Sequence, residues 1–197
     1  MEGTHPVKVN KKFSVALSGA AALLLALSGC GGDDTGKKRD EWAKGVCDQA
    51  AAQVRKIDQA NTAISKVDSG GKPQNVKAAD SAAFKAISDA YRSLAGIFSS
   101  AGPAPGDEGE KYQQNAVSVF TNLSGQYAAL KTQVDGLDTS DQAKFASGLA
   151  GVSNSLKQTT VNAEKSLATL SDGDTGNALA AQPGCQQVSG AVSPTAS

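Results

Sequence analysis

The sequence predicts an all-α protein: an up-down-up-down four-helix bundle behind a signal peptide and a flexible tether. Four stretches of the chain carry apolar residues spaced three and four apart, which is the spacing of one helix face. Glycine- and proline-rich breaks separate these stretches, and no strand-like alternation of valine, isoleucine and aromatic residues occurs. Because three of the four connections are short, consecutive helices are expected to be antiparallel neighbours.

The first 29 residues are expected to be a secretory signal peptide rather than part of the fold. Residues 1–12 contain three lysines and one glutamate, and residues 13–29 contain no charged residue. A basic flank, a short apolar core and small residues at its end are typical of such peptides. As a helix, the 17 uncharged residues would measure about 25 Å, which is slightly short for a membrane span.

The signal peptide ends in Leu27-Ser28-Gly29-Cys30, which resembles the lipobox of bacterial lipoproteins. The resemblance implies that Cys30 receives a diacylglycerol, with acyl chains such as palmitate, and becomes the new N-terminus after cleavage. The chain would then be exported and anchored on the outer face of the cytoplasmic membrane. A soluble secreted protein and an uncleaved anchor are the alternatives. Residues 30–39 begin with a glycine-rich polar spacer and are expected to form a lipidated flexible tether.

The remainder of the chain is similar in composition to small helical secreted lipoproteins of high-GC Gram-positive bacteria, many of which are uncharacterised. It is rich in alanine, glycine, serine, aspartate and lysine. This second resemblance implies a compartment and no activity.

The first predicted helix covers about residues 40–67, and the second covers about residues 75–99. The apolar stripe of the first helix has one polar interruption, at Asn61. In the second helix, Phe84, Tyr91 and Phe98 are seven residues apart and share a face. A bundle core and a ligand groove both fit this stripe.

The third predicted helix opens with Asp107-x-x-Glu110, a capping pair, and continues to about Asp135. The fourth covers about residues 140–170, because Thr139-x-x-Gln142 resembles a capping box. One more helical turn is expected at residues 177–182. The predicted bundle therefore covers residues 40–182, and residues 183–197 form a C-terminal tail.

The chain has three cysteines, Cys30, Cys47 and Cys185. An odd number leaves one thiol over in an exported protein, and the lipidation implied for Cys30 would use it. Cys47 and Cys185 then remain as a pair in a compartment that permits oxidation. An even number of antiparallel helices brings both to the same end of the bundle, so we expect a disulfide that ties the tail back. Two free buried thiols are the alternative.

Several classes of site are excluded by composition. Without residues 1–29 the chain has no histidine, which excludes Ser-His-Asp and Cys-His catalysis and histidine-containing metal sites. Asp172-Gly173-Asp174 lacks the glutamate that ends a calcium loop, and no phosphate-binding loop is present. A net charge of zero argues against a nucleic-acid partner. We therefore expect no cofactor, no metal and no enzymatic activity.

Three functions remain open, and the first is favoured. It is a non-enzymatic binding or adaptor module of the cell envelope, held by the lipid on Cys30, with a protein, cell-wall or lipid partner. The second is a carrier of a small apolar ligand, with a pocket among the bundle aromatics. The third is a hydrolase that uses carboxylates alone. The aromatic residues that would face a carried ligand are Trp42, Phe84, Tyr91, Phe98, Tyr112 and Tyr127.

Overall fold

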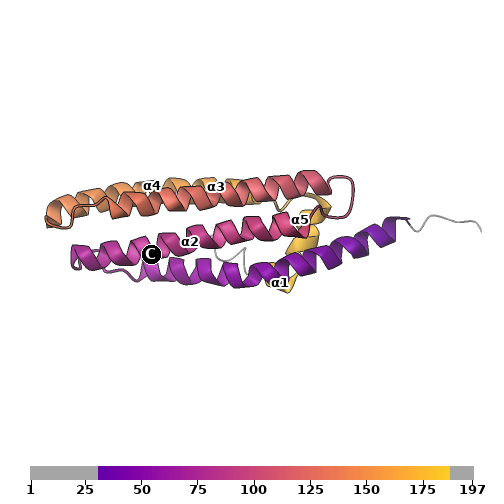
Figure 1. Cartoon of the computed structure of the whole chain (residues 1–197), viewed down its shortest axis with the longest axis horizontal. Coiled ribbons are helices and arrows are strands. Elements are labelled where there is room, and N and C mark those ends of the chain that lie inside the picture. The colour runs from indigo at the N-terminus through magenta and orange to yellow at the C-terminus, as the bar shows by residue number, and fades with distance from the viewer. Residues whose placement is uncertain (1–30, 187–197) are drawn as a thin grey trace, which may run out of the picture. The chain divides into compact units, whose positions relative to one another are not determined.

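The computed structural model describes residues 31–186, and this part of the chain consists of helices and their connections (Figure 1). It contains no strand, which confirms the all-helical prediction. The predicted signal peptide, Cys30 and residues 187–197 lie outside the described residues. In chain order the helices are α1 (Gly31–Ser65), α2 (Pro73–Ala101), α3 (Gly109–Asp135), α4 (Gln142–Ala168), α5 (Gly173–Ala180) and α6 (Pro183–Gln186).

The four long helices pack in chain order. Helix α1 lies against α2, α2 against α3, and α3 against α4, whereas α5 and α6 return to α1 (Figure 1). The ring of Trp42, early in α1, contacts the ring of Phe98, late in α2. The hydroxyl of Tyr112, early in α3, donates a hydrogen bond to the carbonyl of Leu170, just after α4. These contacts show that α1 and α2 are antiparallel, and that α3 and α4 are antiparallel too.

Helix α1 begins at Gly31 rather than near Asp40, so residues 31–39 are helical where a flexible tether was expected. Arg39, the last residue of this segment, contacts distant parts of the chain. The Nε of Arg39 donates a hydrogen bond to the carbonyl of Pro105 (3.1 Å), and Nη1 forms an ion pair with Asp174 (2.8 Å). The polar, glycine-rich sequence suggested a tether because its local composition does not reveal these partners.

Helix α3 begins at Gly109 without the predicted capping pair. Glu108 occupies the N-cap position and makes no side-chain cap hydrogen bond. The preceding loop packs against the first residue of the helix instead. A Cβ atom at Gly109 would lie 1.7 Å from the carbonyl oxygen of Ala104, so this close approach requires glycine.

Helix α4 begins at Gln142, and its N-cap is Asp141 rather than Thr139. The Asp141 carboxylate accepts hydrogen bonds from the backbone N–H groups of Ala143 (2.9 Å) and Lys144 (3.0 Å). A carboxylate adjacent to the helix satisfies these free donors and interacts favourably with the helix dipole. The predicted capping box at Thr139 is therefore wrong.

The chain after α4 is more ordered than expected. Helix α5 begins at Gly173, four residues before the predicted turn at 177–182, and the first residues of the predicted tail form α6. Gly184 of α6 lies against the backbone of Cys47, where an added Cβ would be 2.7 Å from the carbonyl oxygen. This close approach brings α6 to the surface of α1.

Candidate functional site

The six aromatic residues proposed as ligand-facing come together in one row of rings. Phe120 of α3, which was not among the candidates, completes the row between Phe98 and Tyr91. The centroid distances along the row are 6.4 Å for Tyr112–Trp42, 6.1 Å for Trp42–Phe98, 5.3 Å for Phe98–Phe120, 6.3 Å for Phe120–Tyr91, 5.6 Å for Tyr91–Tyr127 and 6.3 Å for Tyr127–Phe84. Each ring is thus in contact with its neighbours, and these contacts are typical of an aromatic core.

The polar atoms at one end of this row are bonded to the backbone. The indole N–H of Trp42 donates to the carbonyls of Ala101 (3.3 Å) and Gly102 (3.2 Å). Burial raises the pKa of Tyr91, Tyr112 and Tyr127, because the phenolate would lose its hydration. The three phenols therefore stay neutral at physiological pH, which suits a structural role.

The disulfide lies near the same end, in the early part of α1. Cys47 and Cys185 are bonded, with their Cα atoms 5.1 Å apart and a sequence separation of 138. Cys47 is fully buried in α1. The predicted pairing is confirmed.

A cleft of about 710 Å³ lies near the start of α1, between α1, the α2–α3 loop and α5. Its polar side chains include the Arg39 guanidinium and the carboxylates of Asp107, Glu108, Asp172 and Asp174. The Arg39 side chain is only 18% exposed and is bonded on two sides, to Pro105 and Asp174. Tyr112 is the one predicted aromatic that lines this cleft. Sequence reasoning missed Arg39, because it assigned this residue to a tether.

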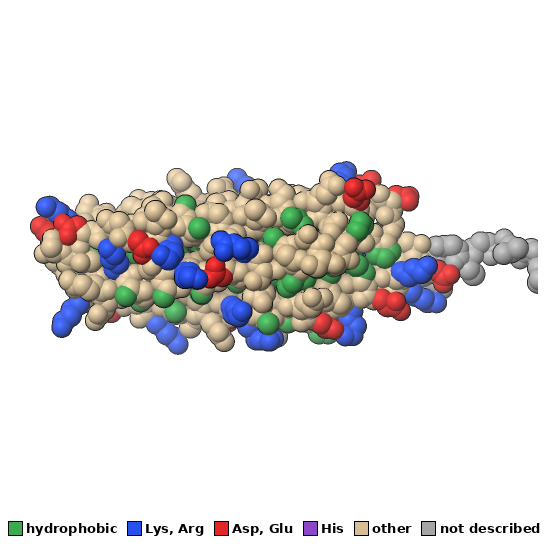
Figure 2. Space-filling model, viewed as in Figure 1, with side chains coloured by type: hydrophobic (Ala, Val, Ile, Leu, Met, Phe, Trp, Pro, Cys, Tyr) green, Lys and Arg blue, Asp and Glu red, His purple; other side chains and the backbone are tan. Residues whose placement is uncertain are grey.

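A second cleft of about 450 Å³ lies between α2 and α3. Its lysines are engaged by the chain itself. Lys77 donates to the carbonyl of Leu137 (2.9 Å), and Lys131 forms an ion pair with Asp135. The bonds from Lys131 and Ser81 lower the pKa of Asp135. Figure 2 shows cationic and anionic side chains interspersed on the face in view, so opposite charges are mixed there.

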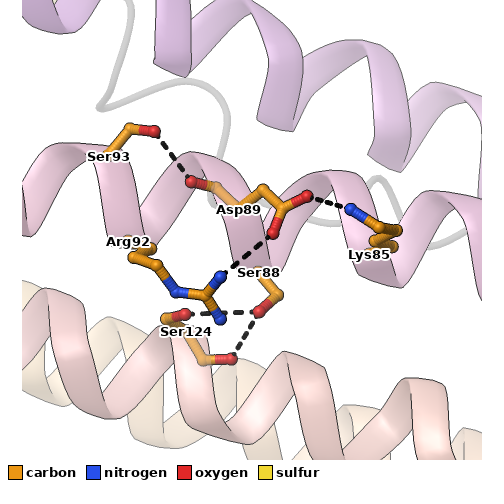
Figure 3. A network of polar contacts seen from close by, with 6 residues as sticks. All are labelled: Lys85, Ser88, Asp89, Arg92, Ser93 and Ser124. Atoms are coloured by element: carbon orange, nitrogen blue, oxygen red, sulfur yellow. Dashed lines mark hydrogen bonds and ion pairs between the residues drawn. The ribbon is translucent and has the colours of Figure 1, made fainter.

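The polar contacts on α2 continue this pattern (Figure 3). Asp89 forms ion pairs with Lys85 and Arg92, and these cations lower the pKa of its carboxyl. The hydroxyl of Ser88 donates to the carbonyl of Ser124 in α3 (2.9 Å), and both serines are buried. The first contacts stabilise the helix surface, and the second joins two helices.

No group of three metal-binding side chains occurs between residues 31 and 186. In the Asp172-Gly173-Asp174 segment, Asp174 pairs with Arg39. Nor does any helix in this part of the chain have the length and apolar character needed to cross a membrane.

Asp80 of α2 is a second residue that sequence reasoning missed. It is 7% exposed, and burial raises the pKa of its carboxyl. Its position could have been found, because it precedes the buried Ile87 by seven residues and therefore belongs to the same helix face.

Comparison with known proteins finds no family model, no curated protein and no solved structure that matches this chain.

Proposed function

We propose that this protein is a lipid-anchored, non-enzymatic binding module of the bacterial cell envelope. The observation that carries this proposal is the row of aromatic rings. These side chains contact one another, and of the predicted six only Tyr112 lines either of the two clefts described above. Binding at the outer surface therefore has more support than the alternative, a carrier that holds an apolar ligand among the rings.

The folded part of this module is proposed to be an up-down-up-down four-helix bundle. Four long helices pack in chain order, and α5 and α6 return to α1. The Cys47–Cys185 bond links the early part of α1 to the segment that follows α4. This link suits an even number of antiparallel helices, since the first and last then share an end.

The proposed anchor is the lipid on Cys30. Two acyl chains are enough for stable membrane attachment, whereas one chain alone is marginal. Because α1 begins at Gly31, the residue after Cys30, the anchor would join directly to the first helix. The module would then sit close to the membrane surface rather than on a long tether.

The anchoring proposal predicts that the mature N-terminus is an acylated Cys30. Intact-protein and peptide mass spectrometry of the exported chain should find this modification, and cell fractionation should find the protein in the membrane. The Cys30→Ala variant should lose both the acyl mass and the membrane association. An unmodified N-terminus at another residue, or release of the wild type into the medium, would contradict the proposal.

The binding role predicts an envelope component that crosslinks to the anchored protein. Crosslinking in intact cells, followed by denaturing purification, should enrich the same component from wild type in repeated experiments. The Cys30→Ala variant, which keeps the same folded surface but loses the anchor, should enrich less of it. Native mass spectrometry of the purified protein examines the carrier alternative. A stoichiometric apolar small molecule, with no crosslinked component, would overturn the binding role in favour of the carrier.

A further inference from the structure

Asp80 occupies a core position of α2. The buried residues at 80, 84, 87, 91, 94 and 98 follow one another at spacings of four and three, which places them on one helix face. The other five are Phe84, Ile87, Tyr91, Leu94 and Phe98, all of them large and mostly apolar. Asp80 is buried like the other five, although its 7% exposure is the largest of the six. A carboxyl group thus occupies a position of α2 at which the apolar spacing predicts an apolar side chain.

Two buried apolar residues of α3 and one amide of α1 lie near the level of Asp80 along the helices. Ser81 donates a hydrogen bond to Asp135 of α3, so Asp80 lies near the level of the buried Leu130 and Val134. On α1, the contact between Trp42 and Phe98 sets an antiparallel register that brings the half-buried Asn61 to this level. This layer lies toward the connections at 66–72 and 136–141, at the opposite end from the disulfide.

The Asp80 carboxylate has no hydrogen bond or ion pair with any residue that the structure describes. Every fully enclosed side-chain nitrogen or oxygen in the described part has a partner. The Asp80 oxygens are therefore not fully enclosed, and a proton can reach them from solvent. An ionised carboxylate that is largely buried and unpaired destabilises the folded state.

No neighbouring charge compensates Asp80. The charged residues nearest its level on the surrounding helices are Lys56 and Asp58 of α1, Lys77 of α2, Lys131 and Asp135 of α3, and Lys144 of α4. Lys77 donates to the carbonyl of Leu137, and Lys131 and Asp135 pair with each other. The remaining three are exposed to solvent.

We propose that Asp80 makes this end of the bundle responsive to pH, because protonation of its carboxyl group tightens the surrounding layer and ionisation loosens it. The proposal goes beyond the binding role and does not depend on it. Burial raises the pKa of Asp80 above that of an unfolded aspartate, near 3.9. The folded state then binds the proton more readily than the unfolded state. The contribution of Asp80 to stability is therefore most favourable below pH 3.9, and it is lost as the pH rises through the pKa of the folded state.

Replacing Asp80 with asparagine tests this proposal, because the amide resembles the protonated carboxyl in size and carries no charge. Denaturant unfolding of the disulfide-bonded exported chain should be measured between pH 3.5 and 7.5. At pH 7 we expect the Asp80→Asn variant to have a folding equilibrium constant about fivefold larger, or more, than the wild type. This advantage should shrink towards zero at pH 3.5. The opposite pH effects of Asp89, Asp135 and Asp138, whose pKa values are lowered, are common to both proteins and cancel.

Asp58→Asn is the matched control, because Asp58 is an exposed carboxylate near the same level of the bundle. It should change stability little and without the pH dependence expected for Asp80→Asn. Hydrogen exchange then locates the effect, and in the wild type the added protection at low pH should concentrate in residues 76–84. A stability difference for Asp80→Asn that is independent of pH, or an asparagine variant that is less stable at pH 7, would overturn the proposal. So would added protection spread evenly over all helices.

Discussion

Replacing Cys47 with serine is expected to lower the free energy of unfolding by about 2–5 kcal/mol. The bond closes a loop of 138 residues, and opening it returns conformational freedom to the unfolded chain. Cys47 is also fully buried, so the serine hydroxyl would need a hydrogen-bond partner inside the core. The helices should remain formed, because their apolar faces do not depend on the bond. Denaturant unfolding followed by far-ultraviolet circular dichroism measures both effects.

Cys185→Ser is the matched control for the disulfide. It removes the same bond, but Cys185 is only half-buried in α6, so its hydroxyl has easier access to water. We expect a loss of stability that is no larger than for Cys47→Ser. Non-reducing peptide mapping should recover the Cys47–Cys185 crosslink from the wild type purified without reductant. Recovery of both cysteines as free thiols would show that the bond does not form.

Replacing Phe98 with alanine is expected to lower the free energy of unfolding by about 3–5 kcal/mol. Phe98 is 5% exposed and lies between two other rings, with centroid distances of 6.1 Å to Trp42 and 5.3 Å to Phe120. Its removal leaves a cavity and interrupts the row of aromatic rings. Trp42 is the only tryptophan in the chain, so its fluorescence reports on this position directly. The variant should unfold at lower urea concentration, with Trp42 emission shifted to longer wavelength before unfolding.

Two further variants make this result specific. Phe98→Leu retains most of the buried volume and should lose less stability than Phe98→Ala. Val161→Ala truncates an apolar side chain of α4 that is 48% exposed, and it should have little effect. If Phe98→Ala were as stable as Val161→Ala, the ring would not be part of a packed core.

The sequence predicted the features that depend on the spacing of apolar residues and on the number of cysteines. Apolar residues three and four apart predicted the helices, and cysteine parity, with lipidation proposed for Cys30, predicted the Cys47–Cys185 pair. The early start of α1 was missed, because the partners of Arg39 are distant in sequence. Helix α5 was too short to show its own periodicity. The burial of Asp80 could have been predicted from the same apolar spacing, but a charged residue was not expected on the buried face of α2.

The sequence predicted which aromatic residues belong to the row, apart from Phe120, but not which rings contact one another. Phe84, Tyr91 and Phe98 follow a seven-residue spacing that is visible in one helix. Their contacts with Tyr127, Phe120 and Trp42 depend on how α1 and α3 align with α2, which no single helix encodes. Spacing therefore predicts which side chains share a face. It does not show whether opposing faces leave room for a ligand.

The position of the disulfide determines how this protein responds to a pulling force. If tension is applied to the segments before Cys47 and after Cys185, the disulfide transmits the force directly from one segment to the other. The segment between the two cysteines then carries no load, however far the flanking segments are stretched. The part of the chain between Cys47 and Cys185 is thus shielded from extension while the disulfide is intact, and it becomes extensible once the bond is reduced.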